Sequence, residues 1–238
     1  MKFRSRRLLN KQSAGPVCRV MRTARLSVKP KRDDRVERFV NRRANLVAAP
    51  VPKVASRTVK QMFVGMRETG GDIEEHLTPD EIRQTYPTAF VFSFVRNPWA
   101  RVYSCWKDKI DDAVTPGKLS IISRFHHLYP FMPFEEFVEW LETEDGSDAH
   151  ADRHWLSQTA HLSSSLGQSF CDFIGRIEAF DDGLREIQRR TGATLSSTGA
   201  LNVQNRSESY VRVFSPRAKR IIGQRYGNDI ETFGYQFN

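Results

Sequence analysis

The run AFVFSFV at residues 89–95 is the sequence feature that most constrains the fold. It carries no charge and is rich in aromatic residues, which is typical of a strand buried on both faces of a parallel sheet. Asn97 and Pro98 follow it and favour the start of a helix. Apolar side chains then recur at helical spacing at Trp99, Val102, Tyr103, Trp106 and Ile110. The segment therefore predicts a strand, a loop and a helix in succession.

The same pattern occurs twice more along the chain. NLVAAPV, from Asn45, is a short apolar run, and it is followed by the loop PKVASRT and by a helical pattern at Val59, Met62, Phe63 and Met66. Further on, DFIGRIE at 172–178 is typical of a strand and precedes another helical pattern. This alternation predicts an α/β fold, a three-layer sandwich with a central parallel sheet. In that architecture ligands bind at the carboxyl ends of the strands, where both loops fall.

Charge divides the chain into two parts. Residues 1–43 hold 15 Lys and Arg against three acidic residues, whereas the remaining 195 residues hold 22 basic and 25 acidic ones. Runs of like charge repel and stay solvated. We therefore predict a flexible basic arm at 1–43 and one folded domain at 44–238. Contact of the arm with an anionic polymer or membrane surface is the alternative, and the slightly acidic domain argues against specific nucleic-acid binding.

Several classes of protein are excluded by the sequence. No apolar run approaches the roughly 20 residues of a transmembrane helix. The N-terminus lacks the pattern of a secretory signal. The three cysteines lie far apart, which fits a reducing compartment. We therefore expect a cytoplasmic protein, with peripheral membrane association through the arm as a further possibility.

The loop at residues 52–58 has the features of an anion-binding site. Its residues are mostly small, and it leads into a helix, whose free N–H groups and dipole favour an anion. Lys53 adds a positive charge, and Ser56 and Thr58 add hydroxyl donors. The Walker pattern G-x-x-x-x-G-K-[ST] is absent from the chain. A simple helix N-cap is the alternative interpretation.

The second loop begins with a charge at the end of a buried strand. Arg96 follows the apolar run directly, and Ser104 lies two helical turns further on. These two side chains are suited to hold one phosphate from two sides. A structural salt bridge is the alternative role for Arg96.

Together the two loops resemble those of the carbohydrate sulfotransferase family. The similarity rests on PKVASRT and FSFVRNPWARVYSCW, on RHWLSQ at 153–158, on CDFIGRIEAFDDGLREI at 171–187 and on RYGNDIETFGYQF at 225–237. It extends from about Asn45 to the C-terminus and leaves out the arm. Two positions depart from the family pattern: Arg57 stands where many members have Ser or Thr, and Trp-Leu-Ser-Gln replaces the usual Trp-x-Pro-Gln.

The resemblance implies a sulfotransferase fold related to the P-loop nucleoside triphosphate hydrolases. It also implies 3′-phosphoadenosine 5′-phosphosulfate (PAPS) as the donor. The donor's 5′-phosphosulfate would lie on the first loop, and Arg96 and Ser104 would hold its 3′-phosphate. The first loop comprises Pro52, Lys53, Val54, Ala55, Ser56, Arg57 and Thr58.

The implied reaction is an in-line displacement at sulfur by an acceptor hydroxyl, and the family resemblance implies that the acceptor is a carbohydrate. Lys53 is expected to stabilise the leaving group. His76, in EEHLTPDEIRQ, is the first candidate for the general base and His154 the second, while Glu74, Glu75 and Glu178 stay open. No metal is expected, because the chain has neither an H-E-x-x-H motif nor a cysteine pair.

Three other functions stay open at this stage. A P-loop nucleotide or small-molecule kinase would share the strand–loop–helix units. A basic-arm binding protein would use residues 1–43, and an inactive relative would bind a glycan only. The polar stretch 111–124 is interpreted as a long loop, and we expect the longer segment 111–133 to cover the acceptor side.

Overall fold

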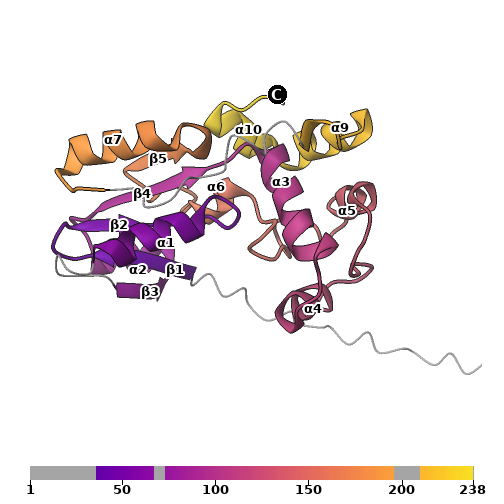
Figure 1. Ribbon diagram of the computed structural model, residues 1–238, viewed down its shortest axis with the longest axis horizontal. Helices are drawn as coiled ribbons and strands as arrows, with labels where there is room; N and C mark the ends of the chain where they lie inside the picture. Colours follow the sequence, from indigo (N-terminus) through magenta and orange to yellow (C-terminus); the bar gives the residue numbers. More distant parts are fainter. Residues whose placement is uncertain (1–35, 67–72, 196–209, 238) are drawn as a thin grey trace, which may run out of the picture. The chain divides into compact units, whose positions relative to one another are not determined.

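The computed structural model describes residues 36–66, 73–195 and 210–237. A five-stranded sheet runs through this part, in the order β3-β1-β2-β4-β5 (Figure 1). Its strands are β1 (Val36–Asn41), β2 (Leu46–Ala48), β3 (Ile73–Leu77), β4 (Phe90–Val95) and β5 (Phe173–Arg176). The expected α/β class is confirmed, and β4 falls on the apolar run that predicted it.

The sheet is mixed, which corrects the expectation of a parallel one. β4 pairs in parallel with both β2 and β5, whereas β1 pairs antiparallel with β2 and with β3. A short turn at 42–45 explains the antiparallel pairing of β1 with β2, because a chain that reverses within a few residues can only pair antiparallel. Asn45 closes this turn with a φ of 49°, in the left-handed region that Asn tolerates.

Strand β1 lies inside the segment that we expected to be an arm. Its central residue, Phe39, is buried against Phe63 at a ring-centroid distance of 5.9 Å. The folded domain therefore begins at least as early as Val36, not at residue 44. The rest of the expected arm, residues 1–35, lies outside the described residues.

Aromatic contacts show which helices cover the sheet. Phe92 and Phe94 of β4 share one face, because side chains alternate along a strand. Phe63 of α1 (Ser56–Gly65) lies 6.2 Å from Phe92, and Phe180 of α7 (Phe180–Thr191) lies 4.7 Å from Phe94. α1 and α7 therefore cover the same face.

The opposite face is also covered. Phe39 packs toward α1, so its neighbour Arg38 faces the other way. The guanidinium of Arg38 lies 5.6 Å from the ring of Phe170. Ile82 of α2 (Pro79–Thr85) belongs to the same core as the sheet. The sheet thus has packed layers on both faces.

A second core lies among helices that follow β4 in the chain, on the side of α3 and α5 (Figure 1). Trp155 is buried there against Phe137 and Trp140. Helix α4 lies in the segment 111–124 that we predicted to be a loop, because Thr115 caps a short helix with Pro116 in its first turn. The remaining elements are α3 (Pro98–Trp106), η2 (Lys107–Asp111), α4 (Pro116–Ile122), α5 (Phe134–Trp140), α6 (Gln158–His161), η3 (Ile177–Ala179), α9 (Pro216–Arg225) and α10 (Gly227–Phe233).

Candidate functional site

The first loop connects β2 to α1 in an unusual backbone conformation. Lys53 has a φ of 70° and Ala55 a φ of 47°, both in the left-handed region that non-glycine residues seldom adopt. Ala55 is the N-cap of α1 and gives no side-chain cap hydrogen bond. The N–H of Thr58 donates to the carbonyl of Ala55 at 2.9 Å, so the N–H groups of Ser56 and Arg57, at the very start of α1, are the ones suited to bind an anion. Ser56 and Thr58 are half-buried there, and Arg57 is exposed.

The second loop packs directly on the first. The guanidinium of Arg96 lies with Nη1 3.4 Å from the carbonyl oxygen of Lys53. The buried Arg101 donates from Nε to the carbonyl of Pro52 at 3.1 Å and from Nη1 to that of Leu156 at 2.8 Å. Arg96, just before α3, and Arg101, on α3, thus bind two consecutive carbonyls of the first loop. The two predicted loops therefore lie together in one site.

Ser104 lies on the same helix as Arg101, two turns beyond Arg96, and is half-buried. The position fits its expected partnership with Arg96 because both residues belong to one strand-to-helix connection. Arg96 itself is half-buried at the end of β4.

Lys53 is paired with a carboxylate that the sequence did not reveal. Its Nζ lies 2.8 Å from Oδ2 of Asp108, on η2, and only 14% of the lysine side chain is exposed. Burial lowers the pKa of Lys53 below its usual 10.5, and the hydrogen bond to Asp108 opposes that fall. Burial would raise the pKa of Asp108, but the hydrogen bond and charge of Lys53 hold it well below its usual range.

The same cluster reaches His154. Lys109 lies 3.2 Å from Asp108, and its charge also acts on the His154 ring. His154 Nδ1 lies 2.5 Å from Oδ1 of Asp152, and Arg124 lies 2.6 Å from the other oxygen of that carboxylate. Because an ionised carboxylate can only accept, Nδ1 carries the proton and Nε2 keeps the lone pair.

Burial is the main influence on His154, whose side chain is 12% exposed. It lowers the pKa of His154 below 6.5, although the hydrogen bond to Asp152 opposes the shift. Burial would also raise the pKa of Asp152, yet its bonds to His154 and the charge of Arg124 hold it at about 2. Near pH 7 this is a neutral imidazole beside an ionised carboxylate.

The structure places His76 apart from this cluster. It lies on β3, the outer strand of the sheet, where it pairs with Glu37 of β1, and its side chain is exposed. β3 is separated from β2 by β1, so two strand spacings divide His76 from the strand that leads to Lys53. Glu74 and Glu75 share β3, but their side chains lie outside the described residues.

Glu178 is held by two structural contacts. One oxygen accepts the N–H of Asn97 at 2.8 Å and the other accepts the hydroxyl of Tyr235 at 2.9 Å. Burial raises the pKa of that Tyr235 hydroxyl, and the nearby charge of Glu178 adds to the rise. Glu178 thus fixes the turn before α3 to the C-terminal segment.

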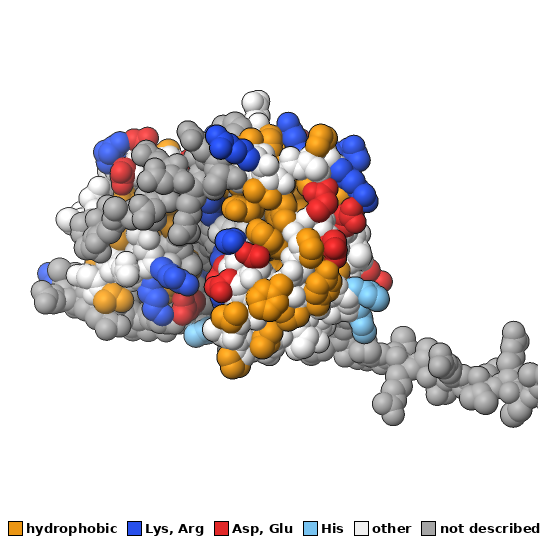
Figure 2. Space-filling model, turned by 45° about the vertical axis from the view of Figure 1, so that its right-hand side comes forward, with side chains coloured by type: hydrophobic (Ala, Val, Ile, Leu, Met, Phe, Trp, Pro, Cys, Tyr) orange, Lys and Arg blue, Asp and Glu red, His pale blue; other side chains and the backbone are white. Residues whose placement is uncertain are grey.

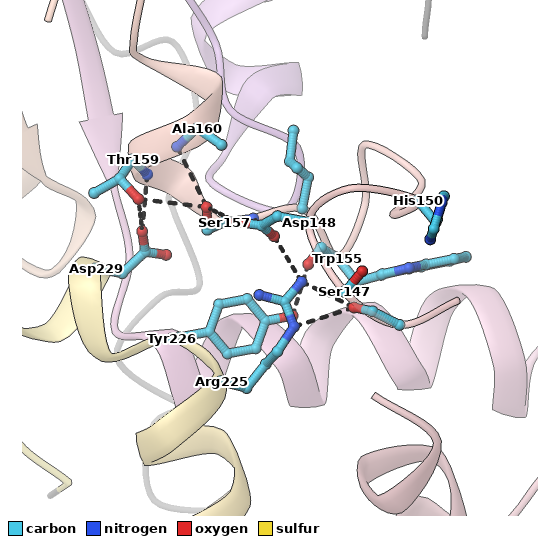
Figure 3. Close-up of polar contacts among 12 residues, drawn as sticks. Ser147, Asp148, His150, Trp155, Ser157, Thr159, Ala160, Arg225, Tyr226 and Asp229 are labelled. Carbon is cyan, nitrogen blue, oxygen red and sulfur yellow. Dashed lines mark hydrogen bonds and ion pairs between the residues drawn. The ribbon is translucent and has the colours of Figure 1, made fainter. Parts of the chain in front are cut away.

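The RHWLSQ stretch holds the backbone of the second loop in place through Gln158. Gln158 is fully buried and binds the Arg96 backbone twice, with Oε1 2.8 Å from the N–H and Nε2 2.8 Å from the carbonyl. The buried Asp229 accepts the N–H groups of Gln158 and Thr159, each at 2.8 Å. A separate ion pair joins Arg225 to Asp148 at 2.6 Å, and Asp148 also accepts from Ser157 (Figure 3).

Sequence reasoning missed Asp108, Asp152, Gln158 and Asp229. Gln158 belongs to the RHWLSQ stretch, and Asp152 lies two residues before His154. The family resemblance of this stretch could therefore have pointed to both residues. Asp108 gave no signal, since an acid in a run of Lys and Asp is typical of a solvated helix face.

Apolar side chains lie exposed on the side of α4 and α5. They gather next to a cluster of basic and acidic side chains (Figure 2). Phe131 is 60% exposed and Val114 64%, both within the segment 111–133. The main chain of Phe131 donates to the carbonyl of Ile110, in η2, so this segment is tied to the helix that carries Asp108. Across the described ranges, no helix has the length and apolar character required to cross a bilayer.

Comparison with known proteins indicates the family of the chain. Residues 36–236 match the model of the Sulfotransferase family. The protein named carbohydrate sulfotransferase 14 of Danio rerio is 29% identical over 128 residues, a match that covers 49% of this chain and 34% of the relative. The match thus spans about a third of the relative's length. No solved structure gives a significant match.

This match corrects the expected cellular location. We predicted a cytoplasmic protein from the sparse cysteines and the absence of a signal. The carbohydrate sulfotransferases to which the matched relative belongs are Golgi membrane-type enzymes. Cysteine spacing reports only on disulfides, which is why it was a poor guide to location here.

Proposed function

The chain belongs to the Sulfotransferase family, and from this premise we propose that it transfers a sulfuryl group from PAPS to a hydroxyl of a carbohydrate acceptor. One observation carries the proposal. The two loops with the family's pattern meet at the carbonyls of Pro52 and Lys53, where Arg101 and Arg96 bind them. That contact gathers the proposed donor-binding groups at one edge of the sheet.

The first loop is proposed to bind the 5′-phosphosulfate of the donor. Ala55 caps α1 in the left-handed conformation and gives no side-chain hydrogen bond to the N–H groups of Ser56 and Arg57, and the helix dipole favours an anion there. The backbone from Pro52 to Thr58, with the Ser56 and Thr58 hydroxyls, forms the cradle. The side chain of Arg57 is exposed, so it adds positive charge near this loop without forming part of the binding surface.

The second loop is proposed to bind the 3′-phosphate of the donor. Arg96 supplies a guanidinium, which recognises phosphate through two parallel hydrogen bonds, and Ser104 supplies a hydroxyl. Gln158 fixes the backbone of Arg96 on both sides, which limits where its side chain can reach. A fixed arginine loses less conformational freedom when it binds.

The chemistry is an in-line displacement at sulfur. The acceptor oxygen forms a bond to sulfur as the bond from sulfur to the 5′-phosphate oxygen breaks, and the electron pair of that bond leaves with adenosine 3′,5′-bisphosphate. Lys53 stabilises the negative charge that grows on the phosphate oxygen. The acceptor hydroxyl gives its proton to a general base.

His154 suits the base better than His76. Nε2 of His154 keeps a lone pair because Asp152 holds the proton on Nδ1, and burial keeps the ring neutral at pH 7. The charge of Lys109, which pairs with Asp108, also acts on the His154 ring. His76 lies exposed on an outer strand and stays the rival candidate.

The acceptor is proposed to approach over residues 112–133, which follow η2. This segment is tied to η2 and carries exposed Tyr129 and Phe131, whose rings offer flat apolar faces to a sugar. Loops of this kind vary freely and set specificity.

Transfer of radiolabelled sulfate tests the proposal. The full chain is mixed with 35S-labelled PAPS and a panel of oligosaccharides, and the labelled products are mapped by mass spectrometry. We expect label in at least one saccharide and protection of the fold against melting by adenosine 3′,5′-bisphosphate. Protection by ATP with Mg²⁺, and none by the bisphosphate, would favour the kinase instead.

A further inference from the structure

Asp108 holds an unusual place for an acid. Its carboxylate lies within 3.5 Å of three ammonium groups, those of Lys53, Lys109 and Lys118. It stands on η2, a π-helical turn directly after α3, and such turns are frequent at functional sites. A carboxylate beside a site for a multiply charged anion repels that anion unless cations surround it.

The pair of Asp108 with Lys53 differs from the Lys107–Asp111 pair of the same turn. Lys107 and Asp111 also form a pair, at 2.5 Å, but the lysine side chain there is 61% exposed. Lys53 is 14% exposed and Asp108 29%. A desolvated ammonium without a counter-charge loses its proton readily, whereas one bound to a carboxylate keeps it. The partner of Lys53 therefore decides its charge.

We propose that Asp108 is a positioning residue, which keeps the Lys53 ammonium charged and directed at the donor site until the phosphosulfate replaces it as the partner. The inference rests on the proposed function, because it takes Lys53 to act on the leaving group. Lys109 and Lys118 balance the carboxylate, so its charge does not oppose the donor.

The groups that face Lys53 are few. Asp108 and Lys109 come from η2, the Cys105 thiol from α3, and Lys118 reaches the same carboxylate from α4. Arg96 approaches the lysine's carbonyl. Burial raises the pKa of Cys105 to about 12, so this thiol is neutral and Asp108 is the anionic partner of the ammonium.

The first test measures the protonation of the Lys53 amine and does not require enzyme activity. Trace labelling of the full chain with acetic anhydride across pH 7–10 gives the reactivity of Lys53 relative to the exposed Lys60 in the same molecule. In Asp108→Asn we expect the pH midpoint of Lys53 labelling to fall and its labelling at pH 8 to rise about tenfold, since an opposite charge at this distance shifts a pKa by about one unit or more. Asp111→Asn is the matched control and should behave as wild type.

The second test reads turnover. The alkaline limb of kcat should move to lower pH in Asp108→Asn but not in Asp111→Asn, and Asp108→Glu should restore the wild-type profile. If Asp108→Asn does not fold, Asp108→Ser takes its place in both comparisons. Equal Lys53 labelling in the Asp108 and Asp111 variants would overturn the inference. If the wild type transfers no sulfate, the proposed function fails, and the labelling result still decides the role of Asp108.

Discussion

Gln158 binds the main chain of Arg96 on both sides, with its Oε1 2.8 Å from the N–H and its Nε2 2.8 Å from the carbonyl. These residues stand 62 positions apart in the sequence. Arg96 is the first residue after β4, and the chain enters α3 two residues later. The contact thus fixes the base of the proposed 3′-phosphate site.

Replacing Gln158 by Ala should weaken both the fold and donor binding. Two half-buried backbone groups of Arg96 would lose their hydrogen bonds to Gln158, at up to about 1–3 kcal/mol each. We expect a lower melting temperature and a higher Kd for adenosine 3′,5′-bisphosphate, measured by calorimetry. Gln188→Ala is the control, because Gln188 donates to the carbonyl of Leu195 at the far end of α7. A Kd that rises equally in both variants would contradict the specific role of Gln158.

Replacing Lys53 by Met should strongly lower the rate of transfer and leave the fold intact. The long apolar side chain fills the space but cannot stabilise the leaving oxygen, and the loss of one such group lowers kcat about 10²–10³-fold. The rate of 35S transfer measures this. Lys60→Met, on the exposed side of α1, should keep wild-type turnover. An active Lys53→Met would remove the lysine from the mechanism.

Arg96→Ala and Ser104→Ala should act on donor affinity more than on kcat. A charge-assisted hydrogen bond contributes about 1.5–3 kcal/mol, so the Kd of adenosine 3′,5′-bisphosphate should rise roughly 10–100-fold in Arg96→Ala. AMP lacks the 3′-phosphate, so its affinity should not change. Equal losses for both nucleotides would mean that these residues shape the site and do not bind the 3′-phosphate.

His154→Ala should lower kcat far more than His76→Ala, with little change in donor affinity. The loss of a general base lowers turnover about 10²–10⁴-fold. The reverse ranking would assign the base to His76.

Asp152→Asn should change the pH profile in a defined direction. Burial lowers the pKa of His154, and the carboxylate of Asp152 opposes this shift. Removing that carboxylate charge therefore lowers the pKa of His154 further. The base must be neutral, so the acid limb of kcat, already below pH 6.5 in the wild type, should move to lower pH. The maximal kcat should fall as well, because the Asn amide can either accept a hydrogen bond from Nδ1 or donate one to it, so the tautomer is no longer fixed. An acid limb at the wild-type position would show that His154 is not the titrating group.

Local patterns predicted much of the fold. The uncharged run at 89–95 predicted β4, and the apolar residues from Val59 onward predicted α1. Apolar residues three and four positions apart lie on one face of a helix, so their spacing alone indicates which face is buried. Strand β1 escaped prediction because its sequence, VERFVN, carries two charges. Arg38 is buried within it, under the ring of Phe170, a contact across the sheet that no local pattern contains.

For the site, the sequence determined the two loops and their order, because each motif is continuous and sits at the end of its own strand. Only the tertiary structure decided which side chains meet there. Asp108 reaches Lys53 across 55 positions, and Gln158 reaches Arg96 across 62. Such pairs depend on how η2 and α6 pack against the strand ends. An ion pair or a buried amide leaves no periodic trace in the sequence, since its energy comes from distance and desolvation in the folded chain.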